Sequence, residues 1–202
     1  MKRALLIFVI GLLCAAPVSA GTIAFEGIVG PGERLFASTG ERPSPQVISD
    51  GVENYVFTLI SGNWSFEDST YVVDPPPKNG TDTMSVDGFQ YSSMTITKLG
   101  GGAFDLNSID LAHWSTGSPT TIHVTSGALF QDFSPGVVFG TFSFPGTWSG
   151  ISSATFTNVG AATAWTLDNI ALNSSPVPEP ASSLLLLGIG LAGLRAWRKR
   201  VD

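Results

Sequence analysis

Two acidic residues at opposite ends of the β-rich region could share a bound ion. Glu26 ends the run Ile23-Ala-Phe-Glu26, which we expect to be the first strand, and Asp168 and Asn169 lie in the last expected strand. The first and last strands of a β-sandwich often neighbour each other, and Ca²⁺ takes about six to eight oxygen ligands. The sequence therefore predicts a structural calcium site formed by Glu26, Asp168 and Asn169. The alternative is that Asp168 and Asn169 cap a turn or form hydrogen bonds with nearby backbone groups.

Tryptophan rings could stack on sugar rings, because an aromatic face offers a large apolar area. Trp114 and Trp148 flank turns rich in Gly and Ser, so we expect them to be exposed and name them as sugar-binding candidates. Trp165 lies inside the last expected strand, where core packing is the expected role.

Enzymatic chemistry finds little support in the residue pattern. His113 and His123 are the only histidines, and neither lies in an H-E-x-x-H motif. The single cysteine, Cys14, excludes a cysteine-based zinc site. Acidic pairs such as Glu67-Asp68 could in principle cleave glycosides, but the acidic residues are scattered. We expect a non-enzymatic protein with no catalytic residues.

The elements that would position these side chains are strands. Short β-branched and aromatic runs separated by Gly- and Pro-containing turns predict an all-β fold, a jelly-roll-like two-sheet β-sandwich of about eight strands over residues 21–176. Residues 35–49 and 69–82 are expected to be loops. Apolar residues change phase near Asn107-Ser108, which predicts a bulge or a bend there. The expected strands cover residues 23–26, 55–60, 93–98, 103–111, 120–125, 137–142, 152–157 and 164–172.

The N-terminal end is typical of a secretory signal. Lys2 and Arg3 precede the apolar run Ala4–Leu13, and Val18-Ser19-Ala20 offers small residues for cleavage. We predict a signal peptide over residues 1–20, with cleavage after Ala20. An uncleaved anchor helix is the alternative.

The C-terminal end has three parts in order. Pro178, Glu179 and Pro180 precede the apolar stretch Ala181–Leu194, and a basic tail at 195–202 contains Arg195, Arg198, Lys199 and Arg200. Residues 177–202 resemble the PEP-CTERM sorting signal of exopolysaccharide-producing Gram-negative bacteria, whose tail is also labelled an "ice-binding protein C-terminal" domain. This resemblance implies processing by an exosortase and export to the cell surface or extracellular matrix.

The apolar stretch suits a transient membrane helix. It has 14 residues, fewer than the roughly 20 that span a bilayer. The basic tail should stay cytoplasmic by the positive-inside rule while the N-terminal signal sends the body outward. A plain C-terminal membrane anchor is the alternative.

The body between these ends is acidic. Residues 21–176 carry four basic and fourteen acidic side chains, a net charge of −10, which argues against nucleic acid as a partner. Phe104-Asp-Leu-Asn-Ser and Trp165-Thr-Leu-Asp-Asn-Ile resemble motifs common in the bodies of PEP-CTERM proteins, which implies a galactose-binding-like jelly roll.

These observations predict an exported, non-enzymatic surface or matrix protein that is sorted by an exosortase and associated with exopolysaccharide or biofilm. The alternative is a carbohydrate-binding module with a structural calcium. Ice binding would need a flat, regular Thr-rich face, and Thr-x-Thr occurs only in short pieces, Thr95-Ile-Thr97 and Thr155-Phe-Thr157.

Overall fold

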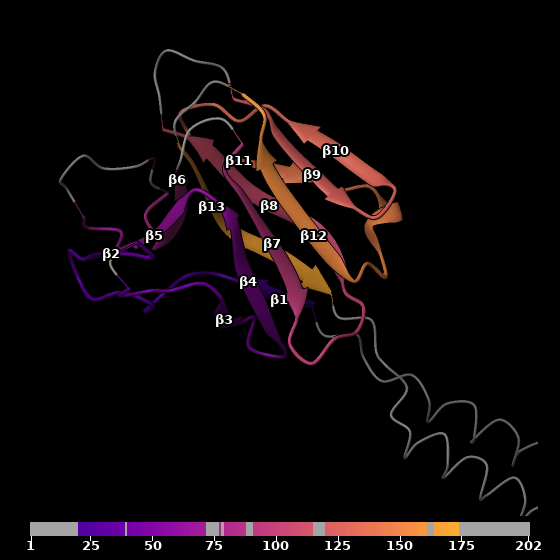
Figure 1. The fold of residues 1–202 in the computed structure, drawn as a ribbon, viewed down its shortest axis with the longest axis horizontal. Coiled ribbons are helices and arrows are strands. Elements are labelled where there is room, and N and C mark those ends of the chain that lie inside the picture. The colour runs from indigo at the N-terminus through magenta and orange to yellow at the C-terminus, as the bar shows by residue number, and fades with distance from the viewer. Residues whose placement is uncertain are drawn as a thin grey trace, which may run out of the picture.

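In the part of the chain that the structure describes, alternating polar and apolar residues place thirteen short strands in two antiparallel sheets (Figure 1). The computed structural model describes residues 20–38, 40–71, 77, 79–87, 91–114, 120–160 and 164–173. The predicted signal peptide up to residue 19 and the predicted sorting signal at 177–202 lie outside these residues.

Sheet A has seven strands in the order β11-β8-β13-β6-β5-β2, with β1 also paired to β13. The strands of sheet A are β1 (Ala20–Ile23), β2 (Arg34–Phe36), β5 (Asn63–Glu67), β6 (Thr83–Asp87), β8 (Asp105–His113), β11 (Gly140–Ser143) and β13 (Ala164–Asn173).

Sheet B has six strands in the order β10-β9-β12-β7-β4-β3. The strands of sheet B are β3 (Gln46–Ser49), β4 (Asn54–Ser61), β7 (Ser93–Lys98), β9 (Ile122–Ser126), β10 (Leu129–Phe133) and β12 (Ser153–Asn158). A short 3-10 helix, η1, spans Gly146–Trp148. Within the described residues, no helix has the length and apolar character needed to cross a membrane.

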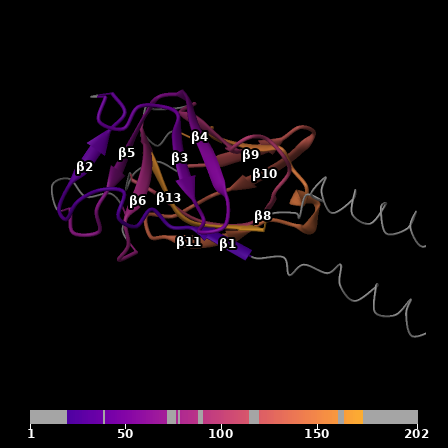
Figure 2. The same ribbon diagram turned by 90° about the horizontal axis from the view of Figure 1, so that it is seen from below.

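The inner faces of the two sheets pack on each other and form the core. Figure 2 shows β8, β11 and β1 in one layer and β3, β4, β9 and β10 in the other. Aromatic side chains fill the space between the layers: Phe25 contacts Phe57 at 5.9 Å between ring centroids, and Phe156 lies 6.3 Å from Trp165. Burial of this apolar surface is the main driving force for folding. The all-β sandwich predicted from the sequence is confirmed.

The pairing of β8 with β13 is interrupted twice. Asp168 pairs with Asp110, Ala171 with Ser108 and Leu172 with Leu106, so β13 bulges after Asp168 and β8 bulges at Asn107. The predicted bulge near Asn107-Ser108 is therefore confirmed. In β13 the bulge changes the phase of the strand, and Trp165, Leu167, Ile170 and Leu172 are all buried as a result.

Several strand predictions need correction. The strand count of about eight is too low. Strand β2 overlaps the expected loop 35–49 and β3 lies inside it, and β5, β6 and β10 do not correspond to any expected strand. The first strand ends at Ile23, so Glu26 lies in the turn after it. A tight turn at Gly62, with φ of 91°, links β4 to β5 and so hides the boundary between two strands. A Cβ there would lie 2.2 Å from the carbonyl oxygen of Asp87, so only glycine fits.

Candidate functional site

Polar side chains on the outer face of sheet A are buried although they point away from the core. Alternate residues of a strand face opposite sides of its sheet, and the neighbours of these residues, such as Phe66 and Val86, are core residues. Buried polar groups need hydrogen-bond partners. The polar residues of this face that are at most 1% exposed are Ser65, Glu67, Thr83, Ser85, Thr166 and Asp168.

An ion pair between Arg34 and Glu67 lies at the centre of these residues. Strand β2 pairs with β5 so that Arg34 is opposite Glu67, and the Arg34 Nε is 2.7 Å from Glu67 Oε1. The Ser65 hydroxyl donates to Glu67 Oε1 at 2.5 Å and the Ser85 hydroxyl donates to Oε2 at 3.0 Å. All of these partners favour a charged Glu67 carboxylate.

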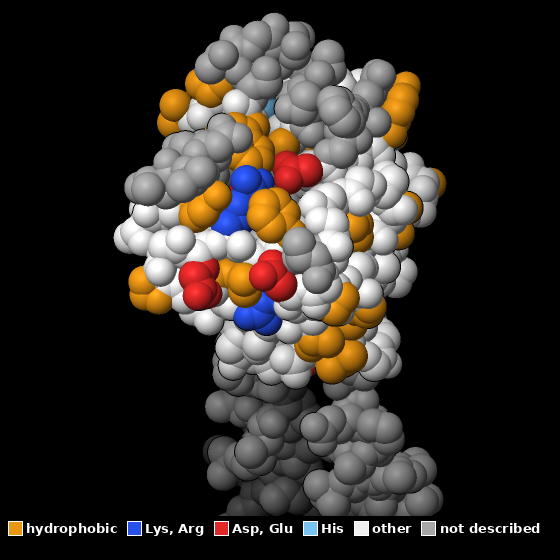
Figure 3. Space-filling model, turned by 60° about the vertical axis from the view of Figure 1, so that its left-hand side comes forward, with side chains coloured by type: hydrophobic (Ala, Val, Ile, Leu, Met, Phe, Trp, Pro, Cys, Tyr) orange, Lys and Arg blue, Asp and Glu red, His pale blue; other side chains and the backbone are white. Residues whose placement is uncertain are grey.

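Aromatic rings surround the Arg34 guanidinium. Its central carbon lies 4.6 Å from the ring centroids of Phe36 and Trp114 and 5.9 Å from that of Tyr71. On this side of the molecule, Figure 3 shows basic side chains lying between hydrophobic and acidic ones. Stacking of this kind stabilises a cation and limits its contact with water, so only 9% of the Arg34 side chain is exposed.

Two adjacent carboxyl groups at the end of β5 have opposite pKa shifts. Burial raises the pKa of Glu67, and the Arg34 guanidinium opposes that rise. The backbone N–H of Gly32 and the Thr70 hydroxyl and N–H hold the pKa of Asp68 at about 2. Glu67 and Asp68 therefore have separate hydrogen-bond partners.

Asp168 is fully buried, and only one of its two carboxylate oxygens accepts hydrogen bonds from the described residues. Its Oδ2 accepts hydrogen bonds from Asn79 Nδ2 at 2.8 Å and from the Thr81 hydroxyl at 2.5 Å. Its Oδ1 is buried and accepts no hydrogen bond from the residues that the structure describes. The hydroxyl of Thr83, on the adjacent strand β6, is likewise buried without a hydrogen bond among these residues. These two oxygens could bind a cation or a water molecule.

The other two residues of the predicted calcium site have different neighbours. Glu26 is exposed, and its Oε1 accepts a hydrogen bond from the backbone N–H of Asp82 at 3.3 Å. Asn169 has φ of 45° at the β13 bulge and donates to Asp110 Oδ2 at 3.0 Å. In the described part of the chain, no three His, Cys, Asp or Glu side chains are grouped to hold a metal ion. The calcium site stays a prediction.

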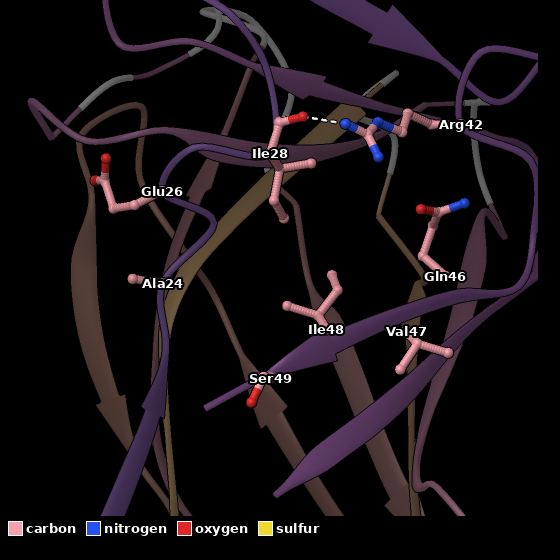
Figure 4. Close-up of a pocket in the computed structure, with 8 residues that line it drawn as sticks. All are labelled: Ala24, Glu26, Ile28, Arg42, Gln46, Val47, Ile48 and Ser49. Atoms are coloured by element: carbon pink, nitrogen blue, oxygen red, sulfur yellow. Dashed lines mark hydrogen bonds between the residues drawn. The ribbon is translucent and has the colours of Figure 1, made fainter. Parts of the chain in front are cut away.

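Glu26 lines a pocket between the segment after β1 and strand β3. The pocket has a volume of about 230 Å³, and Figure 4 shows the Arg42 guanidinium donating a hydrogen bond to the Ile28 carbonyl at its rim. The lining combines four polar residues, among them Glu26 and Arg42, with four apolar ones. The residues that line the pocket are Ala24, Glu26, Ile28, Arg42, Gln46, Val47, Ile48 and Ser49.

The two tryptophans named as sugar-binding candidates lie in different surroundings. Trp114 is partly exposed on the outer side of sheet A, against Arg34. Trp148 is 2% exposed and its ring lies 4.8 Å from that of Phe144. The expected exposure of Trp148 is therefore wrong, because η1 turns this side chain into the core.

Sequence reasoning missed Arg34, Ser65 and Ser85, because it did not predict β2, β5 and β6. The signal was present in the alternation of Asn63–Glu67 and Thr83–Asp87, in which every second residue is apolar. An expectation of two strands there would have placed Ser65, Glu67 and Ser85 on one face.

Comparison with solved structures finds distant similarity to carbohydrate-binding modules. A family 29 module is 14% identical, with 77% of this chain and 91% of that chain covered and a TM-score of 0.40. The family 11 module of a cellulosomal cellulase of Clostridium thermocellum is 10% identical, with 79% and 97% covered and a TM-score of 0.37. Likeness at this level carries no information about a ligand. None of the curated proteins compared with the chain matches it.

The C-terminal end gives a specific match. Residues 176–200 match the family described as the PEP-CTERM protein-sorting motif. This range contains Pro178, Glu179 and Pro180, the apolar stretch and the basic residues up to Arg200. The resemblance noted in the sequence is confirmed, and the chain is an exported protein that carries a PEP-CTERM protein-sorting motif at its C-terminal end.

Proposed function

We propose that this protein is a non-enzymatic component of the surface or extracellular matrix of a Gram-negative bacterium, sorted by an exosortase and associated with exopolysaccharide or biofilm. The PEP-CTERM match at residues 176–200 carries the proposal. The tail would hold the chain in the inner membrane until the exosortase acts near Pro178–Pro180. The body would then reach the cell surface.

The charge distribution supports this topology. The body has a net charge of −10, whereas the last eight residues contain Arg195, Arg198, Lys199 and Arg200. A basic end is retained on the cytoplasmic side of a membrane. An acidic body suits export and repels nucleic acid and anionic lipid.

Cell fractionation tests the sorting step. In the native host, deletion of residues 178–202 should abolish surface retention of the body and release it. The triple variant Pro178→Ala, Glu179→Ala, Pro180→Ala should instead leave an unprocessed chain in the inner membrane. Ser182→Ala with Ser183→Ala is the matched control beside the motif and should fractionate like the wild type. Unchanged fractionation of both the deletion and the triple variant would contradict the proposal.

Two observations favour a second candidate, a carbohydrate-binding module with a structural calcium. Trp114 is partly exposed beside Arg34, and Asp168 Oδ1 is a buried carboxylate oxygen without a hydrogen bond among the described residues. Sugar recognition combines an aromatic face with a few polar groups, and a calcium ion would use the free carboxylate oxygen.

A glycan array and a melting experiment test the second candidate on the full chain in mild detergent. Specific binding that needs millimolar Ca²⁺ and that Trp114→Ala abolishes is the expected result. EDTA should lower the melting temperature, and Asp168→Ala should remove that difference. Absence of any EDTA effect on the wild type would count against the ion.

A further inference from the structure

Hydroxyl-bearing side chains cover the outer face of sheet B. Their strand neighbours, including Phe57, Ile96 and Phe156, are buried in the core, so these residues point to the other side of the sheet. We call them the hydroxyl face. It is built on the four inner strands of sheet B and consists of Thr58, Ser93, Thr95, Thr97, Thr125, Ser153, Thr155 and Thr157.

The strand register aligns these side chains in rows. Thr155 pairs with Thr95 on one side and with Thr125 on the other, and Thr95 pairs with Thr58. Four threonines therefore lie across four adjacent strands, which are about 4.8 Å apart. The two Thr-x-Thr pieces of the sequence are thus direct neighbours. The Oγ1 atoms of Thr95 and Thr155 are 2.8 Å apart, which confirms that these side chains share a face.

This face carries almost no charge, unlike the rest of the body. Among the described strand residues on this side, the ionisable side chains are His123 and Asp132, which bond to each other across β9 and β10. The outer face of sheet A, in contrast, contains Glu67 and Asp168. In a body with a net charge of −10, the hydroxyl face is the neutral side.

Exposed apolar side chains border the hydroxyl face. Phe130, opposite Thr125 on β10, is 68% exposed, and Ile60, at the end of β4, is 61% exposed. Tyr91, just before β7, is 61% exposed. Figure 1 shows β7, β9, β10 and β12 in front of β8 and β13, and the pairing of Phe130 with Thr125 places Phe130 beside the rows. These exposed apolar side chains are accessible to a ligand that lies across the rows of hydroxyls.

We infer that the hydroxyl face binds the surface of an extended, neutral polysaccharide, an inference that rests on the proposed association with extracellular polysaccharide. Sugar hydroxyls both donate and accept hydrogen bonds, as the Ser and Thr hydroxyls do. The C–H faces of sugar rings match Phe130, Tyr91 and the threonine methyl groups.

The alternatives fit less well. The acidic body repels an anionic polymer. Among the described strand residues of this face, a cationic polymer would meet one acidic side chain, Asp132, which already bonds to His123. An ice surface would call for an uninterrupted Thr array, but Val56 and His123 stand in the outward positions beside Thr58 and Thr125.

Co-sedimentation of the full chain in mild detergent tests the inference. The probes are insoluble cellulose, curdlan and mannan as neutral polysaccharides, and calcium alginate gel as an anionic one. The wild type should sediment with at least one neutral polysaccharide and not with alginate. Thr155→Lys and Phe130→Ala should each reduce the bound fraction at least tenfold, whereas Thr155→Ser should bind like the wild type.

Two controls separate the two faces. Thr22→Lys adds the same charge to an exposed strand threonine of sheet A and should bind like the wild type, as should Trp114→Ala. Melting temperatures identify a variant that has lost its fold, and Phe130→Ala, at an exposed position, tests the face independently of Thr155→Lys.

Several results would overturn the inference. Failure of the wild type to sediment with any neutral polysaccharide contradicts a neutral ligand, and so does equal binding to alginate. Wild-type binding by both Thr155→Lys and Phe130→Ala contradicts the role of the hydroxyl face, as does loss of binding only in Trp114→Ala. Inhibition of ice recrystallisation that Thr155→Lys abolishes, without polysaccharide binding, would assign the face to ice instead. Tail-dependent fractionation is measured separately, so failure here leaves the sorting proposal intact.

Discussion

On the outer face of sheet A, the hydroxyls of Ser65 and Ser85 donate to the buried Glu67 carboxylate. On the outer face of sheet B, the hydroxyls of Thr95 and Thr155 bond to each other and stay partly exposed. Both faces consist of alternate polar residues of antiparallel strands. One contains charges that are held away from water, and the other is neutral and open.

The difference lies in what each face needs for stability. Buried charges require partners, and removing one partner leaves the other uncompensated. Partly exposed hydroxyls can exchange their partner for water at little cost. Substitutions on sheet A should therefore affect folding, whereas substitutions on the hydroxyl face should affect binding.

The largest expected effect comes from Arg34→Met. The methionine would fill much of the space between Phe36 and Trp114, but it would leave Glu67 buried without its cation. Breaking a buried ion pair in this way costs about 3–5 kcal/mol. Urea unfolding of the variant and the wild type measures the difference.

The double variant Arg34→Met, Glu67→Gln is the control for this prediction. It removes both charges, and the glutamine amide can still bond to both serines. Its carbonyl oxygen accepts from one hydroxyl, and its NH2 group donates to the oxygen of the other. The double variant should regain most of the lost stability. If Arg34→Met unfolds within about 1 kcal/mol of the wild type, the ion pair does not stabilise sheet A as argued.

The sequence identifies the inner faces of these sheets better than the outer ones. Runs such as Tyr55–Ile60 and Ser93–Lys98 were predicted as strands because β-branched and aromatic residues mark them, and β4 and β7 contain them. The Arg34–Glu67 pair could not be predicted, because it joins β2 and β5, two strands distant in the sequence whose register periodicity does not give. The rows of the hydroxyl face likewise depend on pairing between distant segments, which periodicity alone does not give.

Ser85→Ala should have the next largest effect. The Ser85 hydroxyl is fully buried, donates to Glu67 Oε2 at 3.0 Å and lies 3.1 Å from the Thr166 hydroxyl. Loss of this donor leaves a buried carboxylate oxygen with one partner fewer, at a cost of about 1–3 kcal/mol. Urea unfolding measures the change as a shift in the midpoint concentration, provided that the dependence of the unfolding free energy on urea has the same slope in both proteins. A midpoint equal to that of the wild type would show that water replaces the hydroxyl. Water would then reach the outer face of sheet A, contrary to the burial of Ser85.

Acid should lower the free energy of unfolding, because it protonates Asp68 at the end of β5 in sheet A. Its folded pKa of about 2 lies below the unfolded value of roughly 3.9. The ionised group therefore stabilises the fold fully above the unfolded pKa and loses this contribution as the pH falls through the folded pKa. The stability advantage of the wild type over Asp68→Asn should shrink between about pH 4 and pH 2. An advantage that stays constant across that range, measured by thermal unfolding, would contradict this assignment.

The smallest effect on stability is expected for Thr155→Val on the hydroxyl face. Valine keeps the branched shape and the strand preference of threonine. The Thr95 hydroxyl loses a partner at 2.8 Å, but it is partly exposed and can bond to water. The free energy of unfolding should change by less than about 0.5 kcal/mol. Polysaccharide binding should fall clearly, because one donor and acceptor at the centre of a row is lost. A stability loss comparable to that of Ser85→Ala would show that the hydroxyls of sheet B support the fold as those of sheet A do, and the contrast between the two faces would disappear.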